Sequence, residues 1–291
     1  MTQAVPGRIL PTRRAALAGA TCLALAPPAA AHWTADWTFP AYAEAMRASD
    51  RRTDLTAQSF AQMRQRRTHV LQQLETWLRD ELGVADPAVM RALAEVPREY
   101  FHYHYGDNRS FARDAWDWFP RPWPIGYGST LSALLIQAYM TQLVRPLPGD
   151  TALEIGTGSG YQVALLSRLT RQTHSIEIIE PLGTAAAKLF RPLGLHNIET
   201  RIGDGYHGWP EEKDGFDIVM LTCAAQHVPP ELIRQLKPGT GRLIAPIGQK
   251  FRGEQFLYVF TKDANGRVRS RRDIGVIFVP MTGRIAADRR D

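Results

Sequence analysis

Residues 152–161 read Ala152-Leu153-Glu154-Ile155-Gly156-Thr157-Gly158-Ser159-Gly160-Tyr161, and they are the clearest indication of the fold. It has the order of an apolar strand, a glycine-rich turn and the start of a helix. Glycine allows positive φ and close approach of the backbone to a ligand. Such a turn after the first strand of a doubly wound sheet lies where these sheets bind nucleotides. Its spacing is G-x-G-x-G rather than the G-x-G-x-x-G of dinucleotide binders, which disfavours a nicotinamide dehydrogenase.

Strand and helix patterns alternate after this turn, which predicts a parallel α/β sheet with helices on both faces. The expected fold is therefore a doubly wound, Rossmann-like sheet, mostly parallel with a C-terminal antiparallel strand. The predicted strands are residues 151–155, 173–178, 198–203, 216–222, 241–246, 256–262 and 272–278, and the predicted helices are residues 160–169, 182–193 and 230–236.

Acidic side chains stand at the ends of the first strands. Glu154 lies inside an otherwise apolar strand, where a carboxylate is costly unless it finds partners. Glu177 ends the next strand, where an acid can accept both hydroxyls of a ribose, although Glu180 is a nearby competitor.

The third and fourth strands end in weaker signals. Asp204, between Gly203 and Gly205, could accept a hydrogen bond from an adenine amino group, but Gly-Asp-Gly is also a common turn. Thr222 ends the apolar fourth strand, which the topology brings near the same site.

The N-terminal half predicts a helical subregion. A helix is expected over residues 55–81 with Gly83 as its C-cap, and a second one begins with Asp86 as N-cap and Pro87 at its first position. Residues 98–128, rich in aromatics and prolines, predict a structured loop over a pocket, followed by a helix over 131–145. Residues 32–54 have no clear period.

The first residues resemble a targeting signal. Residues 1–14 carry three arginines and no acid, residues 15–26 are apolar, and small residues follow. Thr12-Arg13-Arg14 is similar to the start of a twin-arginine signal. The alternatives are a disordered Ala/Pro-rich leader or a misassigned start codon. The apolar run is too short to span a bilayer and no other segment could, so we expect no integral membrane segment.

Composition excludes several classes of function. A hydrophobic content of 44% and a charged content of 22% are ordinary for a globular protein. The net charge of +6 comes from scattered arginines rather than a basic stripe, so we expect no nucleic-acid partner. Two cysteines allow neither a disulfide framework nor a cysteine-based metal site, and we expect no metal.

A series of segments, in order, resembles the protein-L-isoaspartate O-methyltransferase family over about residues 65–283. Beside the LEIGTGSGYQ loop at 153–162, they are VPREYF at 96–101, PIGYGSTLS at 124–132, HN at 196–197, GDG at 203–205, GW at 208–209, LKPG at 236–239, PIG at 246–248 and FVP at 278–280. Several matches in the correct order are far more specific than any one of them.

The resemblance implies a class I methyltransferase fold that uses S-adenosyl-L-methionine and acts, as a monomer, on isoaspartyl-containing proteins and peptides. Ser132, with Thr130 beside it, would orient the substrate carboxylate, although Ser132 could instead cap the following helix. The cofactor would be held by Glu154, Gly156, Thr157, Gly158, Ser159, Gly160, Glu177, Asp204, Gly205 and Thr222.

The resemblance predicts five segments: a leader (1–31), an extension (32–64), a methyltransferase domain (65–283) divided into a substrate-side part (65–148) and a cofactor-binding core (149–283), and a tail (284–291). It also implies a cytoplasmic enzyme, whereas the leader implies a periplasmic one, and both remain open.

Two segments depart from the family pattern, residues 133–136 and 223–227. They leave open a methyltransferase of the same fold acting on another carboxylate or a small molecule. A non-catalytic module that binds the cofactor and recognises modified peptides is the second alternative.

Overall fold

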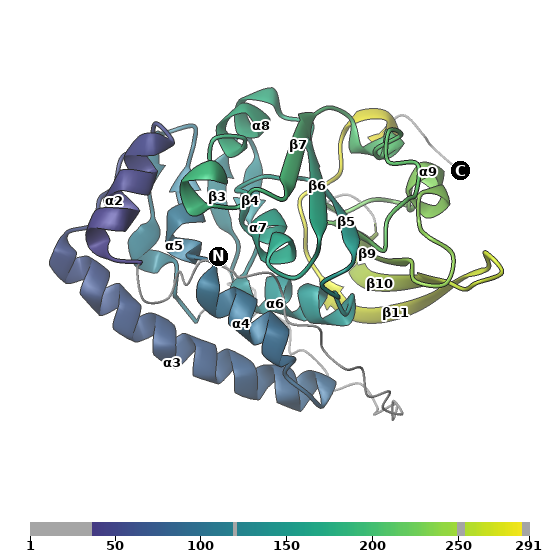
Figure 1. Cartoon of the computed structure of the whole chain (residues 1–291), viewed down its shortest axis with the longest axis horizontal. Coiled ribbons are helices and arrows are strands. Elements are labelled where there is room, and N and C mark those ends of the chain that lie inside the picture. The colour runs from purple at the N-terminus through teal and green to yellow at the C-terminus, as the bar shows by residue number, and fades with distance from the viewer. Residues whose placement is uncertain (1–36, 119–120, 249–253, 287–291) are drawn as a thin grey trace, which may run out of the picture.

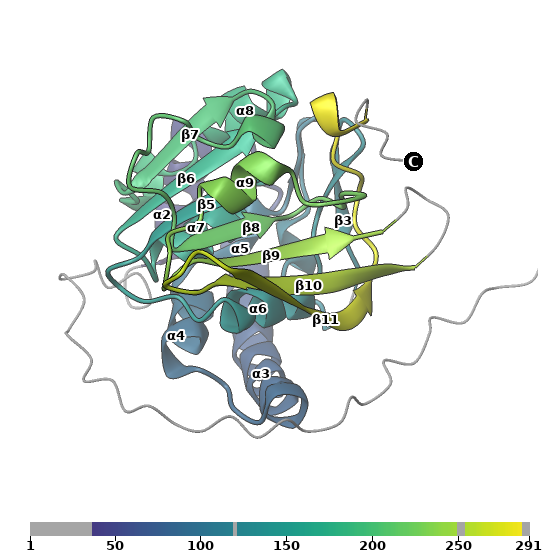
Figure 2. The same cartoon turned by 90° about the vertical axis from the view of Figure 1, so that its right-hand side faces the viewer.

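The computed structural model describes residues 37–118, 121–248 and 254–286, and the predicted leader lies outside them. The core is a seven-stranded sheet in the order β11-β10-β9-β8-β5-β6-β7 (Figures 1 and 2). Its strands are β5 (Thr151–Ile155), β6 (Gln172–Glu177), β7 (Ile198–Ile202), β8 (Ile218–Leu221), β9 (Arg242–Ile247), β10 (Gln255–Lys262) and β11 (Val268–Val276).

The first five of these strands are parallel, and β10 runs antiparallel to both β9 and β11. This arrangement confirms the expected doubly wound, mostly parallel sheet. All seven strands overlap their predicted ranges and β5 has the predicted bounds, but β11 begins at Val268 rather than at residue 272.

The sheet is covered on both faces, which is the usual condition of a parallel sheet. Ile218 and Met220 of β8 pack into the larger core cluster, whereas Val219 and Leu221 pack into the smaller cluster on the other face. The larger cluster joins the sheet to the N-terminal helices, with α9 on the opposite side (Figures 1 and 2). The α-helices are α2 (Phe39–Ala48), α3 (Ala57–Leu82), α4 (Pro87–Glu95), α5 (Arg98–Phe101), α6 (Leu134–Leu143), α7 (Tyr161–Ser167), α8 (Glu180–Ala186) and α9 (Pro230–Arg234).

The helix caps that the sequence predicts are confirmed. Gly83 ends α3 in the left-handed conformation with φ 77°, which glycine adopts without strain. The Asp86 carboxylate accepts hydrogen bonds from the backbone N–H groups of Ala88 and Val89, and Pro87 opens α4. None of the helices within the described ranges is both long and apolar enough to cross a bilayer.

Several local predictions are wrong. Residues 98–128 are not simply a loop: they contain α5 and three short strands, β1 (Tyr103–His104), β2 (Arg109–Ser110) and β3 (Trp123–Gly126). The next helix begins at residue 134 rather than 131, because residues 129–131 form β4, which pairs with β3. Residues 32–54 contain α2, which sequence periodicity did not reveal.

The helix predicted over residues 182–193 is interrupted. The α-helix ends at Ala186, and residues 191–193 form a short 3-10 turn that contains Pro192. Proline lacks a backbone N–H and disfavours the helical conformation of the residue before it, so a continuous helix cannot pass through this position. The remaining 3-10 turns are η1 (Ala112–Asp114), η3 (Gly205–His207) and η4 (Gly283–Ala286).

A buried carboxylate anchors the short helix α5 to the rest of the N-terminal region. Glu99 is 1% exposed, and its two oxygens accept the indole N–H groups of Trp37 and Trp116, each at 2.8 Å. A buried charge is tolerated only when it is hydrogen-bonded in this way. Trp37 therefore ties the segment before α2 to the methyltransferase-like part of the chain.

Trp37→Phe removes one of these donors and leaves a buried carboxylate oxygen without a partner. We expect the free energy of unfolding to fall by about 1–3 kcal/mol in denaturant titration. Trp209→Phe is the matched control, because it makes the same change in another buried ring, one that packs against His174. Equal losses of unfolding free energy in the two variants would show that the hydrogen bond from Trp37 to Glu99 adds no stability beyond the effect of changing the ring.

Candidate functional site

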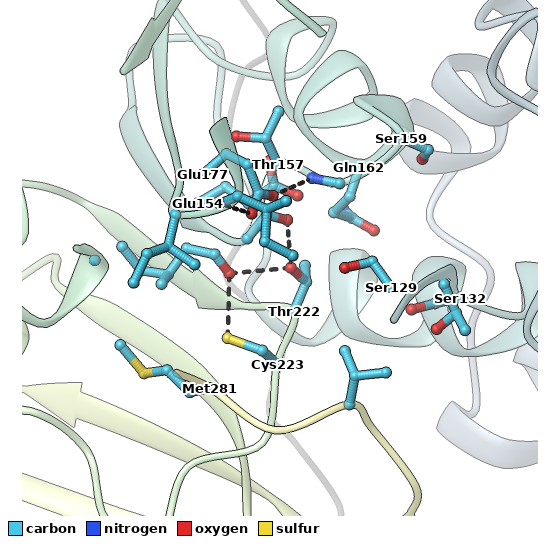
Figure 3. A pocket seen from close by; sticks show the side chains of 18 of the residues that line it. Ser129, Ser132, Glu154, Thr157, Ser159, Gln162, Glu177, Thr222, Cys223 and Met281 are labelled. Carbon is cyan, nitrogen blue, oxygen red and sulfur yellow. Dashed lines mark hydrogen bonds between the residues drawn. The ribbon is translucent and has the colours of Figure 1, made fainter. Parts of the chain in front are cut away.

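A cavity of about 250 Å³ lies at the carboxyl ends of β5, β6 and β8, and the hairpin of β3 and β4 forms its opposite wall (Figure 3). Ten of the twelve predicted site residues line it, so residues from distant parts of the sequence meet here. They are Thr130, Ser132, Glu154, Gly156, Thr157, Gly158, Ser159, Glu177, Gly205 and Thr222.

Backbone hydrogen bonds hold the glycine turn against the neighbouring strands. The N–H of Gly156 donates to the carbonyl of Ile176 at 2.8 Å, and the N–H of Thr222 donates to the carbonyl of Ile155 at 3.0 Å. Gly156 has φ 99°, and a Cβ there would lie 2.7 Å from Thr222 Oγ1. This position therefore requires glycine for both its conformation and its space.

Glu154 is fully buried at the end of β5, and its carboxyl group accepts fewer hydrogen bonds than it could. Its Oε2 accepts a hydrogen bond from Ser175 Oγ at 2.6 Å, and Ser175 Oγ also lies 2.6 Å from Thr157 Oγ1. Its Oε1 has no hydrogen-bond partner among the described residues. Burial raises the pKa of Glu154 well above its usual value. The site thus contains a buried acceptor with capacity for a ligand donor.

Glu177, at the end of β6, fastens the glycine turn. Its Oε2 accepts the N–H of Gly158 at 2.8 Å, and its Oε1 accepts the N–H of Ile179 at 2.9 Å. Burial raises the pKa of Glu177, while these backbone hydrogen bonds act in the opposite direction. A carboxylate oxygen can accept more than one hydrogen bond, so Glu177 can hold the turn and still accept from a ligand hydroxyl.

Cys223 lies in the cavity wall immediately after Thr222. Burial raises the pKa of its thiol to about 12, and the carboxyl groups of Glu177 and Glu154 add to the shift. The reactive form of cysteine is the thiolate, and a raised pKa disfavours that form near pH 7, which argues against a nucleophilic role for Cys223.

The opposite wall carries hydroxyl groups from β4 and the residue after it, among them Ser129, Thr130 and Ser132 (Figure 3). The N-cap of α6 is Ala133, and no side chain makes a capping hydrogen bond there. Ser132 therefore lies before the helix without capping it, and it is among the residues that face the cavity.

Two predicted residues do not line the cavity. Gly160 is the N-cap of α7, with φ 83°. The carboxylate of Asp204 accepts the backbone N–H groups of Tyr206 at 2.9 Å and Arg284 at 2.7 Å, which joins η3 to η4. Contact between Asp204 and an adenine amino group stays a prediction.

The sequence did not single out several lining residues. Tyr127, Gln137, Gln162 and the 279–282 segment all reach the cavity. Only the FVP motif at 278–280 could have indicated the last of these, and that motif carries no chemistry of its own. Tyr127 and Gln162 stand inside the PIGYGSTLS and LEIGTGSGYQ segments, although the resemblance gives them no role, whereas Gln137 lies on α6, which tertiary packing brings to the site.

Comparison with known proteins identifies the family. The profile of protein-L-isoaspartate(D-aspartate) O-methyltransferase matches residues 67–286. The chain belongs to this family. A protein-L-isoaspartate O-methyltransferase 2 of Syntrophobacter fumaroxidans is 47% identical over 198 residues, which are 68% of this chain and 76% of that protein. One of the same name from Shewanella sediminis is 42% identical over 233 residues, covering 80% and 89% respectively.

Solved structures of the same family have the same fold. A protein-L-isoaspartate O-methyltransferase matches with a TM-score of 0.63 and 25% identity, over 75% of this chain and 67% of that one. A putative family member from Plasmodium falciparum, solved in complex with S-adenosyl-L-homocysteine, matches with a TM-score of 0.58 and 23% identity, over 72% and 97%.

We predict that Glu154→Gln changes how stability depends on pH. The pKa of Glu154 in the folded protein lies above its ordinary value of 4.5, so its contribution to stability is present at acid pH and declines as pH rises through the folded pKa. The stability of the variant relative to wild type should rise with pH above 4.5, by up to about 1.4 kcal/mol per pH unit within that window.

Denaturant titrations between pH 5 and pH 8 measure this difference. Glu44→Gln makes the same change at an exposed carboxylate on α2 and is the control for the effect of the substitution itself. A constant difference for Glu154→Gln would mean that the pKa of Glu154 in the folded protein is not raised above its ordinary value.

Proposed function

We propose that the protein transfers the methyl group of S-adenosyl-L-methionine to the carboxylate of L-isoaspartyl residues in damaged proteins and peptides, which initiates their repair. The observation that carries the proposal is the meeting of two sets of family residues in one cavity. The glycine turn with Glu154 and Glu177 forms one wall, and Ser132 lies on the other.

The glycine-turn wall suits the cofactor. Glu154 Oε1 is a buried acceptor without a partner, and it would take a hydrogen bond from a cationic or N–H group of the cofactor. Glu177 stands at the end of the second strand of the sheet core, where an acid accepts ribose hydroxyls in nucleotide-binding folds. Thr157, Gly158 and Ser159 complete this wall.

The opposite wall would hold the acceptor. An isoaspartyl carboxyl group has an ordinary pKa near 4 and is already ionised at neutral pH, so methyl transfer needs no general base. The cofactor would supply its methyl group to one carboxylate oxygen, which gives a methyl ester and leaves S-adenosyl-L-homocysteine. The Ser132 hydroxyl would donate to the other oxygen, with Thr130 beside it.

Positioning is therefore the main task of the protein. Holding two reactants in line at near-attack distance can lower a barrier by about 7–11 kcal/mol. We propose that the enzyme acts as a monomer, as the family resemblance implies, and without a nucleic-acid partner, since its arginines are scattered rather than gathered in a basic stripe.

The experiment that tests this function measures methyl transfer from labelled cofactor to an isoaspartyl peptide and to its aspartyl twin. We expect turnover of the isoaspartyl peptide only. Equal methylation of both peptides would favour the alternative of a methyltransferase for another carboxylate. Cofactor binding without turnover of either would favour a non-catalytic module.

We predict that Glu177→Ala weakens cofactor binding by about 1–3 kcal/mol, the usual scale for hydrogen bonds to a charged group. The variant loses both the proposed ribose contacts and the bonds that hold Gly158 and Ile179. Calorimetric titration with S-adenosyl-L-homocysteine measures the effect. An unchanged affinity would remove Glu177 from the cofactor site.

Ser132→Ala should lower turnover of the isoaspartyl peptide by about tenfold or more, the effect of losing one hydrogen bond to a charged group. Cofactor affinity should stay within about twofold of wild type, because the proposed role concerns the acceptor alone. Steady-state kinetics and cofactor titration on the same preparation separate the two effects. Normal turnover in this variant would exclude an orienting role for Ser132.

A further inference from the structure

Arg98, the first residue of α5, is a buried cation whose hydrogen bonds go only to neutral groups. It is 2% exposed, and burial lowers its pKa to about 10, which still leaves it protonated at neutral pH. Its Nε donates to the carbonyl of Ala115 at 3.1 Å, its Nη1 to Gln137 Oε1 at 2.5 Å and its Nη2 to the carbonyl of Ser132 at 2.8 Å.

The carboxylate next in sequence does not pair with Arg98. Both oxygens of Glu99 accept indole N–H groups, and no ion pair involving Arg98 is found within the described ranges. A buried cation without an acid beside it is costly, and an apolar side chain of similar size would fill the space at lower cost. What the guanidinium provides is a rigid fork of charge-assisted hydrogen bonds, which are stronger than neutral ones.

Two of these hydrogen bonds reach the wall that holds the acceptor in the proposed function. Ser132 and Gln137 both line the cavity, on either side of the start of α6. Because a guanidinium only donates, it fixes the carbonyl of Ser132 and also turns the Gln137 amide so that Oε1 faces Arg98. The ring of Tyr161, 4.9 Å from the guanidinium carbon, supports the same group from α7.

We propose that Arg98 is the positioning residue of the acceptor wall: it holds the Ser132 backbone and the Gln137 amide in the arrangement that binds the isoaspartyl carboxylate. This inference rests on the proposed function. Arg98 does not line the cavity and acts through the two residues that do. Loss of the Arg98 guanidinium should therefore weaken binding of the acceptor peptide more than binding of the cofactor.

The test compares Arg98→Met and Arg98→Lys with the control Arg67→Met, which removes another buried guanidinium, one that packs over Trp116. Hydrogen–deuterium exchange of residues 129–137 reports the wall directly and needs no turnover. We expect faster exchange there in Arg98→Met and wild-type exchange in the control. The lysine variant should fall between them, since an ammonium can replace some of the donors but not the fork.

Kinetics supply the functional readout. Arg98→Met should raise KM for the isoaspartyl peptide at least tenfold and lower kcat, with the Kd of S-adenosyl-L-homocysteine within twofold of wild type. Unchanged exchange at 129–137, an equal effect in Arg67→Met, or a parallel loss of cofactor affinity would overturn the inference. If Arg98→Met does not fold, the lysine variant is judged by the same criteria. Absence of turnover in wild type would refute the proposed function, while the exchange data would still decide the role of Arg98.

Discussion

The parallel pairing of β5 with β6 on one side and β8 on the other is the constraint on which the site depends. In a parallel sheet the carboxyl ends of neighbouring strands lie at one edge, so whatever follows each strand gathers there. Two backbone hydrogen bonds continue this pairing just past the strand ends. The N–H of Gly156 donates to the carbonyl of Ile176, and the N–H of Thr222 donates to the carbonyl of Ile155. Glu154, Glu177 and Thr222 are thereby brought together although up to 68 residues separate them, from 154 to 222.

Three buried acids show how the same residue type serves structure or ligand binding according to its partners. Each oxygen of Glu99 accepts one indole N–H, and this carboxylate, which does not line the cavity, fastens α5 to the N-terminal segment. Glu177 accepts hydrogen bonds from the N–H groups of Gly158 and Ile179, which holds the glycine turn, and it can accept a further hydrogen bond from a ligand. Glu154 has one oxygen on a serine hydroxyl and the other without a partner. Of the three, Glu154 alone has an oxygen without a partner among the described residues, and it therefore indicates the β5 end as the centre of the proposed cofactor site.

The parts of this molecule that the sequence predicts are those encoded locally. The bounds of β5, the Gly83 cap and the Asp86 cap follow from residues within a few positions of one another. The parts that it does not predict depend on distant contacts. Nothing near Gln137 indicates that Arg98 turns its amide, and nothing near Trp37 indicates that its indole reaches Glu99. Asp204 shows the same limit, because its bond to the N–H of Arg284 joins residues 80 positions apart. Trp37 also lies before the part of the chain that the family profile matches, residues 67–286.

We expect the cofactor and the acceptor to meet in one cavity at the carboxyl edge of the sheet. A crystal structure of the protein with S-adenosyl-L-homocysteine and an isoaspartyl peptide tests this expectation. It should show the cofactor against residues 156–159, with its ribose at Glu177, and the isoaspartyl carboxylate within hydrogen-bond distance of Ser132 Oγ and facing the cofactor sulfur. A peptide carboxylate bound away from Ser132, or a cofactor lying outside the cavity at the ends of β5 and β6, would contradict it.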